Sequence, residues 1–279
     1  MTHLEVLKDL ASKGIVTHTG TYHADDVMSG ALLLLAGVCD AQDINRVQNL
    51  PENFEGLAFD IGRGTFDHHQ IDARVRDNGV KYAAFGLLWD FIGRDTIMKV
   101  YDEQNQKPAP SEVVEIAFED FDAFIQMLDQ TDNFGPEKYP NSLSYMISAR
   151  STVDPGDDGY YCAITMYLYD LECMVRRVII NAENKVLAKH MGTKEVVIID
   201  NGKYIPAICF KGTKTKFLVQ KSNREGLWNL NAVNPWSIVL EKDEMEGCQF
   251  LHTAKFLATF TSLEAASKAA FDNASKIPV

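Results

Sequence analysis

The sequence predicts an α/β fold: a largely parallel sheet flanked by helices, followed by a second, smaller α+β domain. Short β-rich runs alternate with helical stretches over the first half of the chain, which is the pattern of strand–helix–strand units. After residue 190 the character changes to closely spaced strand candidates. At 279 residues the chain is long for a single hydrophobic core. We therefore expect two domains, 1–190 and 191–279.

The first expected strand is β-branched and bounded by glycines, and the helix after it begins with acidic residues and ends before Gly37. A long region without proline or glycine after Gly159 is helical in pattern throughout, as one helix or as two packed helices. The expected elements of the first domain are a helix at 4–13, a strand at 15–18, a helix at 25–36, strands at 45–48 and 56–61, helices at 83–93 and 95–104, a longer helix opening at 111, and helices at 141–150 and 157–190.

The helix that opens at Ser111 carries an apolar stripe whose members step by three and four residues and end at Leu128. Asp132 continues the stripe by one more step of four. Because an unpaired buried carboxylate is costly, Asp132 is a candidate functional residue. An exposed turn is the alternative, since Asn133 and Gly135 follow. Asp129 lies one position off the stripe and is a weaker candidate.

In the second domain, the run 195–203 has the signature of a β-hairpin, with Asn201-Gly202 at the turn. The remaining expected elements are strands at 204–210, 216–220, 227–233 and 250–260 and a closing amphipathic helix at 263–275.

The composition is that of a soluble globular protein, with 46% hydrophobic and 24% charged residues. No apolar run approaches the roughly 18–20 residues that span a bilayer, so we expect no membrane association. The N-terminal residues lack the pattern of a signal peptide. Five scattered cysteines without a C-x-x-C pair argue against a disulfide framework and against a thiolate zinc site. A cytoplasmic protein is expected, and the formation of a homo-oligomer is left open.

The chain is acidic, with 27 Lys and Arg against 39 Asp and Glu and a formal net charge of −12. Proteins that wrap long nucleic acids usually carry a basic surface. Any nucleic-acid substrate should therefore be short, or be held by a local basic patch.

The first candidate motif is His18-x4-His23-x-Asp25, between a strand and the following helix. That position directs side chains into the crevice beyond the carboxyl end of the strand, where open α/β sheets bind ligands. The alternative is that Asp25 only caps the helix and the histidines are polar loop residues. Asp26 is expected to act only as a cap or as a first-turn carboxylate.

The second motif is Asp67-His68-His69, which follows a strand-like run that ends near Asp60. Consecutive histidines on a strand point to opposite sides, but in a turn both can reach one metal ion or two adjacent ones. A solvated surface loop is the alternative.

Together these motifs offer imidazoles and carboxylates at the ends of separate elements, and no thiolates. Mixed nitrogen and oxygen ligands suit Mn²⁺, with iron, cobalt or zinc as alternatives. Two ions about 3.5–4 Å apart could promote attack of water on phosphorus. No G-x4-G-K-[ST] loop is present, which excludes a P-loop nucleotidase.

The order of these residues resembles the motifs of the DHH phosphoesterase superfamily, which includes manganese-dependent pyrophosphatases, single-strand exonucleases and oligoribonuclease-type enzymes. More closely, T-H-T-G-T-Y-H-A-D-D, F-D-H-H-Q, D-Q-T-D-N and S-A-R resemble the melanocyte proliferating gene one family, as do Trp228–Val233 and Gly247–Phe256. That family, also catalogued as metal-dependent protein hydrolases, includes a 3′–5′ RNA exonuclease.

The resemblance implies a role for each matching residue. It implies metal ligation by His18, His23, Asp25, Asp60, His68 and Asp132, with Asp60 as the bridge. Asp67, His68 and His69 would form the catalytic motif, and His69 would be a ligand or contact the scissile phosphate. Arg150, His252 and Lys255 would contact the substrate. Two departures are His23, where many members have aspartate, and the loss of the glycines after His252.

We therefore predict a metal-dependent hydrolase with two divalent cations, Mn²⁺ in the first place. The expected activity is that of a phosphodiesterase, a 3′–5′ exonuclease or oligoribonuclease acting on short single-stranded RNA or small nucleotides. The alternatives are a hydrolase like the inorganic pyrophosphatases and a non-catalytic metal- or nucleotide-binding module. No feature of the sequence supports peptide hydrolysis.

Overall fold

A computed structural model describes residues 1–277 and divides the chain into two compact units. One unit ends at Ile180 and the other begins at Asn181. The sequence places the domain boundary further on, at residue 190, and helix α6 (Asp157–Met191) contains both positions. Each unit is described separately below, and the assignment of different roles to the two units stays a prediction.

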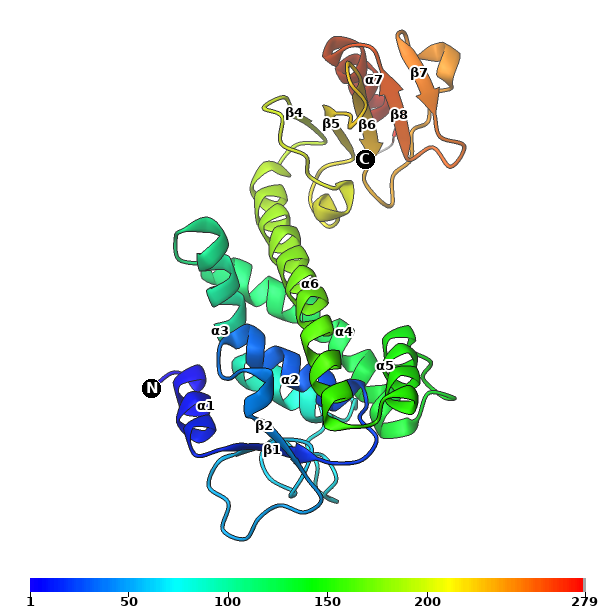
Figure 1. Ribbon diagram of the computed structural model, residues 1–279. Coiled ribbons are helices and arrows are strands. Elements are labelled where there is room, and N and C mark those ends of the chain that lie inside the picture. Colours follow the sequence, from blue (N-terminus) through cyan, green and yellow to red (C-terminus); the bar gives the residue numbers. More distant parts are fainter. Residues whose placement is uncertain (278–279) are drawn as a thin grey trace. The chain divides into compact units, whose positions relative to one another are not determined.

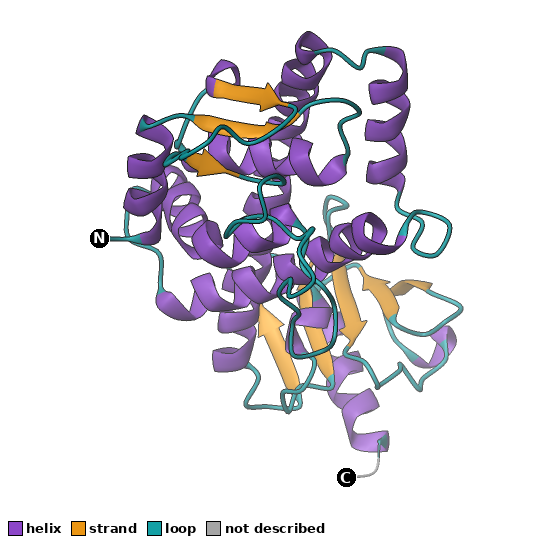
Figure 2. Ribbon diagram, turned by 90° about the horizontal axis from the view of Figure 1, so that it is seen from below, coloured by secondary structure: helices purple, strands orange, loops and turns teal. Residues whose placement is uncertain are grey.

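The first unit contains a three-stranded parallel sheet of order β2-β1-β3 (Figures 1 and 2). Its strands are β1 (Ile15–His18), β2 (Ile44–Val47) and β3 (Leu57–Ala58). Ile15 of the central strand pairs with Ile44 on one side and with Leu57 on the other. The parallel arrangement brings the carboxyl ends of β1 and β3 to the same edge of the sheet, where the candidate motifs begin. The predicted α/β class is confirmed.

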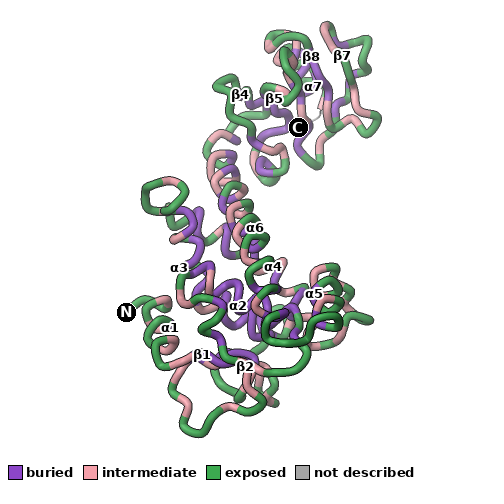
Figure 3. Tube along the Cα trace, in the orientation of Figure 1, coloured by how far each residue is buried: buried purple, intermediate pink, exposed green. Residues whose placement is uncertain are grey.

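Helix α2 is the buried centre of this unit (Figure 3). It is buried at every position except Leu34, which explains why its sequence is apolar on all sides. A β-carbon on Gly30 would lie 2.6 Å from Ile164 and 3.4 Å from Ile44, so glycine permits this close packing. None of the described helices is both long and apolar enough to cross a membrane. The helices of the unit are α1 (His3–Ser12), α2 (Ala24–Ala36), α3 (Ala84–Asn105), α4 (Ser111–Phe134), α5 (Ser142–Val153) and the first part of α6.

The two helices predicted at 83–93 and 95–104 are wrong, because α3 continues through Gly93 without a break. A β-carbon at Gly93 would lie 2.6 Å from the indole of Trp89, so this glycine makes room for a ring rather than ending a helix. Gly86, in the first turn of α3, allows a similar approach: a β-carbon there would lie 2.3 Å from Asp129 Oδ2.

The second unit contains a five-stranded sheet of order β4-β5-β6-β8-β7, in which only β4 and β5 are parallel. Alternate residues of β5 serve two cores: Phe217 and Val219 pack with helix α7 (Leu263–Lys276), whereas Leu218 packs on the other side with Val197 and Phe210. The strands are β4 (Val196–Ile199), β5 (Phe217–Lys221), β6 (Trp228–Ala232), β7 (Cys248–Leu251) and β8 (Leu257–Phe260).

The predicted hairpin at 195–203 and the strand at 204–210 are wrong. The chain does turn at Gly202, with φ of 80°, but β4 then pairs with β5 in parallel. Pro206 has no N–H to donate to a ladder, and residues 207–210 form a 3₁₀ helix instead. Hydrogen bonds between the side chain of Gln220 and the backbone of Ile205 hold this segment.

The single strand predicted at 250–260 is also wrong, because it is two antiparallel strands, β7 and β8. The turn between them places Lys255 in the left-handed region, with φ of 53°. The local apolar pattern continues through the turn because Phe256 remains there, half exposed.

Candidate metal centre

Seven histidine and aspartate residues converge at the sheet edge formed by the ends of β1 and β3. They make three overlapping groups in which the donor atoms lie within 4.8 Å of one another. Asp60 belongs to two of the groups and so does His68. The groups are Asp60, His68 and His69; His18, Asp26 and Asp60; and Asp25, His68 and Asp132.

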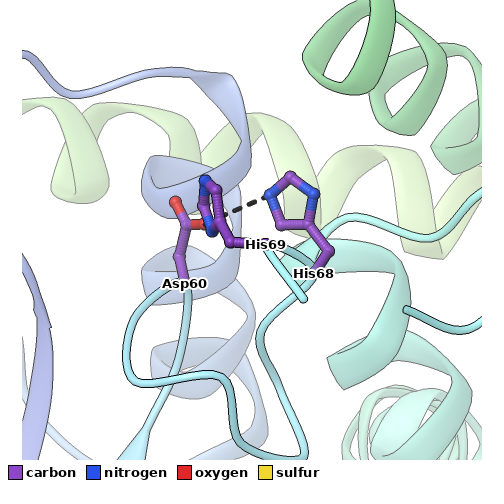
Figure 4. A group of neighbouring side chains, drawn as sticks. All are labelled: Asp60, His68 and His69. Atoms are coloured by element: carbon purple, nitrogen blue, oxygen red, sulfur yellow. Dashed lines mark ion pairs between the residues drawn. The ribbon is translucent and has the colours of Figure 1, made fainter. Parts of the chain in front are cut away.

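Asp60 lies at the centre of the cluster, two residues after β3, and is 5% exposed. Its two carboxylate oxygens face different partners. Oδ2 lies 3.2 Å from His18 Nε2, whereas Oδ1 lies 3.3 Å from His68 Nε2 and 3.7 Å from His69 Nδ1 (Figure 4). Asp60 also has a φ of 54°, a conformation that costs free energy for most residues and that aspartate and asparagine adopt more readily.

The imidazoles of His18 and His68 are each oriented by a hydrogen bond at Nδ1. His18 Nδ1 lies 3.0 Å from the carbonyl of Thr19, and His68 Nδ1 lies 3.3 Å from the side-chain oxygen of Asn133. The amide nitrogen of Asn133 donates to the carbonyls of Tyr82 and Asp129, so its oxygen faces the ring. An acceptor at Nδ1 places the proton there and leaves Nε2 as the ligand atom, which is how protein metal sites commonly fix a histidine.

The carboxylate of Asp67, 2% exposed, organises the loop that carries the histidine pair. Its Oδ1 accepts from the backbone N–H groups of His68 and His69 at 2.7 and 3.1 Å and contacts His69 Nδ1 at 2.7 Å. Its Oδ2 accepts from the N–H of Arg63 at 2.6 Å. The two rings lie 4.3 Å apart at their centroids. Both can therefore face Asp60, which consecutive histidines on a strand could not do.

Asp25 and Asp26 open helix α2 and are both buried. The helix N-cap is His23, so Asp25 is not the cap of its own helix. Asp25 instead accepts hydrogen bonds from the N–H groups of Ala84 and Phe85, at the start of α3, and its Oδ2 lies 3.9 Å from His68 Nε2. Asp26 Oδ2 lies 3.2 Å from His18 Nε2. The expectation that Asp26 acts only as a cap or first-turn charge is therefore wrong.

A cavity of about 630 Å³ opens over this cluster, and we call it the cluster cavity. His23, an exposed residue, lines it, and its ring centroid lies 6.1 Å from that of His18. Asp132 also lines it, 20% exposed, with Oδ2 at 3.2 Å from His68 Nε2. Arg63 is the one lysine or arginine among the lining residues in the described part of the chain. The lining residues are His18, Thr21, His23, Asp60, Ile61, Gly62, Arg63, Asp67, His69 and Asp132.

The electrostatics couple these groups strongly. Burial lowers the pKa of both His18 and His68, but nearby carboxylates outweigh this effect. Asp26 and Asp60 raise the pKa of His18 to about 11, and Asp132 and Asp60 raise the pKa of His68 to about 11. The two imidazoles in turn lower the pKa of Asp60 to about 2, against the effect of its burial. Burial, together with the charges of Asp132 and Asp60, raises the pKa of Asp25. A metal ligand must be deprotonated, so a cation competes with protons for both histidines.

The cluster fits a divalent cation site on two observations. First, the buried atoms Asp26 Oδ2, Asp60 Oδ1 and His68 Nε2 have no hydrogen-bond partner among the described residues. Buried polar atoms are nearly always paired, so a set of unpaired atoms gathered around Asp60 suits bound ligands. Second, several buried carboxylates repel one another unless a cation offsets their charge. The donors are imidazole nitrogens and carboxylate oxygens, which suit Mn²⁺ and similar ions.

The predicted substrate contacts are not among the seven residues of the cluster. Arg150 is half-buried in the last turn of α5, with its guanidinium 3.9 Å from Cys162 Sγ. His252 and Lys255 belong to the second unit: the ring of His252 lies 4.2 Å from that of Phe256, and Lys255 pairs with Glu241. The roles of these three residues, and of the predicted ligands, stay predictions.

Sequence reasoning missed two residues of the site, Asp26 and Arg63. A signal for Asp26 was present, because it is one of two adjacent aspartates at the start of a helix that is apolar on all sides. Arg63 lies between Asp60 and Asp67 in a Gly-Arg-Gly run, and this closeness to the predicted ligands was the available signal.

Comparison with known proteins identifies a family for this chain. The model of MYG1_exonuc, described as uncharacterised protein family UPF0160, matches residues 14–154, which include every residue of the cluster. The MYG1 protein of Dictyostelium discoideum is 27% identical over 150 residues, 50% of this chain and 44% of the relative. The MYG1 protein YER156C of Saccharomyces cerevisiae is 29% identical over 143 residues, which are 48% of this chain and 41% of the relative. Each match thus spans less than half of the relative's length.

Among solved structures, RecJ in complex with Mg²⁺ from Thermus thermophilus gives a TM-score of 0.29 at 13% identity, covering 99% of this chain and 52% of RecJ. The structure of the same protein with Mn²⁺ gives a TM-score of 0.27 at 14% identity, covering 99% of this chain and 54% of RecJ. Scores this low do not establish a common fold, and the fold described above follows from the chain's own elements.

Proposed function

The chain belongs to the MYG1_exonuc family, as the resemblance in its motifs predicted, and from this premise we propose that it is a divalent-metal-dependent phosphoesterase. The proposed activity is exonucleolytic, in the 3′–5′ direction, on short single-stranded RNA or small nucleotides. One observation carries the proposal: the two oxygens of Asp60 face separate histidines, at 3.2 and 3.3 Å, at the floor of an open cavity. A carboxylate in that position can bridge two cations.

The proposed ligands fall on the two sides of Asp60. His18, Asp26 and Asp60 would hold one ion. The other would be held by His68 with Asp60 and Asp132, whose oxygens lie 3.3 and 3.2 Å from His68 Nε2, and Asp25 lies close to the same nitrogen. His23 lines the same cavity. Bound divalent cations would supply charge that polarises a phosphoryl oxygen and makes a water molecule more acidic. We propose Mn²⁺ because of the mixed nitrogen and oxygen donors.

The chain's own residues would position the phosphate. His69 is 59% exposed and lines the cavity, and its Nδ1 is held by Asp67, so Nε2 is left to contact a phosphate oxygen. Arg63 supplies a guanidinium on the same cavity wall and suits a charge-assisted hydrogen bond to phosphate. His252 and Lys255 stay proposed substrate contacts from the second unit.

The metal requirement can be tested on the purified chain. We expect EDTA to abolish hydrolysis of short RNA and Mn²⁺ to restore it, with proton release on binding because His18 and His68 must lose protons. Metal analysis would measure the number of bound ions. Calorimetry in buffers of different ionisation enthalpy would measure the number of protons released, and end-labelled substrates would show the direction of cleavage. Absence of turnover of oligonucleotides, dinucleotides and pyrophosphate with Mn²⁺ would contradict the proposal. Metal binding without turnover would favour a non-catalytic module.

A variant at Arg63 tests the phosphate contact. We expect Arg63→Gln to lower kcat/KM by roughly 10- to 150-fold, since hydrogen bonds to charged groups contribute about 1.5–3 kcal/mol. Arg63→Lys, which keeps the charge, should recover part of the loss, and Mn²⁺ affinity should be unchanged in both variants. Arg74→Gln, at an exposed arginine of the following loop, is the matched control. Equal rates for Arg63→Gln and the control would show that Arg63 does not contact the substrate.

A further inference from the structure

The first unit contains two further cavities, and one of them adjoins the cluster cavity. One, of about 310 Å³, is formed by residues of α2, of the end of α4 and of α5, and we call it the side pocket. It shares His23 and Asp132 with the cluster cavity. The other, of about 400 Å³, shares Pro136 and Tyr145 with the side pocket and is also lined by Met146. The side pocket thus shares lining residues with the cluster cavity and with the cavity of about 400 Å³.

The side pocket has the mixed lining of a small-molecule site. Leu128, Pro136 and the ring of Tyr145 supply apolar surface. Tyr145 is 75% exposed although it is a large aromatic residue, and it lies where the two outer cavities meet. The volume falls at the small end of the roughly 300–1,000 Å³ range of ligand pockets. An exposed aromatic ring beside such a pocket offers a face on which a planar group can stack.

Two hydroxyl groups complete the pocket. Ser144 and Ser148 lie four residues apart on one face of α5, and neither hydroxyl has a hydrogen-bond partner among the described residues. Thr131, by contrast, already donates its hydroxyl hydrogen to the backbone carbonyls of Met127 or Tyr139. Each free serine hydroxyl can both donate and accept, so the pair can bind a ligand edge that carries both kinds of group.

In the part of the chain that the structure describes, no lysine or arginine lines the side pocket or the cavity beside it, which limits the charge of the ligand that they can bind. A second phosphate group, as in pyrophosphate or a nucleotide polyphosphate, would therefore find no cation there. A planar, uncharged group with hydrogen-bonding edges fits the lining.

We propose that the side pocket binds the nucleobase of the nucleotide whose phosphate lies at the metal centre, with Tyr145 stacking on the base. The inference rests on the proposed function and makes it more specific, because it selects nucleotides over inorganic pyrophosphate. Stacking accepts every base, and the two serine hydroxyls can adjust to different base edges. We therefore expect the protein to prefer ligands that carry a base and to discriminate little between the different bases.

Direct binding tests the proposal without relying on turnover. AMP and ribose 5-phosphate carry the same phosphate and differ by the base, so their affinities in Mn²⁺ isolate its contribution. We expect AMP to bind about 5- to 150-fold more tightly, which corresponds to about 1–3 kcal/mol at 1.4 kcal/mol per tenfold. Tyr145→Ala should remove most of this difference, and Tyr145→Phe should keep it. Tyr169→Ala, at another exposed tyrosine of the same unit, is the matched control and should keep it as well.

The outcomes separate this inference from the proposed function. The base pocket would be overturned if the wild-type protein bound the two ligands equally, or if Tyr145→Ala kept the preference for AMP. Turnover of a dinucleotide by the same preparation would still support the phosphoesterase. A Tyr145-dependent preference for AMP in a protein that hydrolyses nothing would support the pocket and overturn the enzyme. Absence of binding of both ligands would count against both.

Discussion

Asp60→Asn is expected to reduce metal-dependent hydrolysis by about 10³-fold or more and to leave the chain folded. A bound metal ion supplies several kcal/mol of transition-state stabilisation, and about 4 kcal/mol corresponds to a factor of 10³. The amide offers one oxygen where the carboxylate offers two, so it cannot bridge the sides occupied by His18 and His68. Asparagine keeps the volume of aspartate and tolerates the φ of 54° at this position.

The measurements are the hydrolysis rate, the Mn²⁺ stoichiometry and the circular dichroism spectrum. We expect fewer bound ions than in the wild-type protein and an unchanged spectrum. Asp72→Asn, at an exposed carboxylate in the loop after the histidine pair, is the matched control and should retain full activity. An unchanged rate in Asp60→Asn would place the chemistry elsewhere. If Asp60→Asn does not fold, Asp132→Asn tests the same cluster at a partly exposed position.

Arg76→Ala is expected to destabilise the first unit by about 3–5 kcal/mol, because it leaves a buried charge without its partner. Arg76 is 9% exposed and donates to Asp129 Oδ2 at 2.6 Å and to Asp122 Oδ1 at 2.9 Å. Its guanidinium also lies 3.8 Å from the ring centroid of Tyr82. These contacts connect the loop after the histidine pair to α4, which carries Asp132 and Asn133. The loss is measured by denaturant unfolding against Arg74→Ala, an exposed arginine paired with Asp90, which should cost about 0–1 kcal/mol.

The pH dependence identifies the cause of this loss. Burial raises the pKa of Asp129 to about 7, while Arg76 opposes the shift, so Arg76→Ala should raise that pKa further. A group whose folded-state pKa lies above its unfolded value binds more protons in the folded state, and its contribution to stability falls as pH rises. The deficit of Arg76→Ala should therefore be larger at pH 8 than at pH 5, and adding Asp129→Asn should recover part of it. A deficit independent of pH would indicate lost packing against Tyr82 instead.

Several features of the fold follow from local sequence alone. β1, α2 and β2 were predictable because β-branched runs, an acidic helix start and Gly37 act within a few residues, and Gly37 does cap α2, with φ of 72°. The breaks inside longer elements were not predictable in the same way. Gly93 predicts a helix end, but it lies inside α3 and makes room for the indole of Trp89. Asn201-Gly202 predicts a hairpin, but β4 pairs with β5 in parallel. In both cases a partner distant in the sequence or on another turn decides the structure.

For the site, local sequence sufficed to predict the family and every histidine and aspartate of the cluster except Asp26, because H-x4-H-x-D and D-H-H place ligand groups at strand ends whatever the packing. Which carboxylate oxygen faces which imidazole ring depends on contacts between elements that are distant in the chain. Asp25 is drawn to the start of α3, where free N–H groups need acceptors, and the next helical position turns Asp26 toward His18. The tertiary structure alone also brought α5 and Tyr145 beside the cluster cavity. Local spacing fixes which groups approach an edge, whereas their directions depend on helices that are distant in the chain.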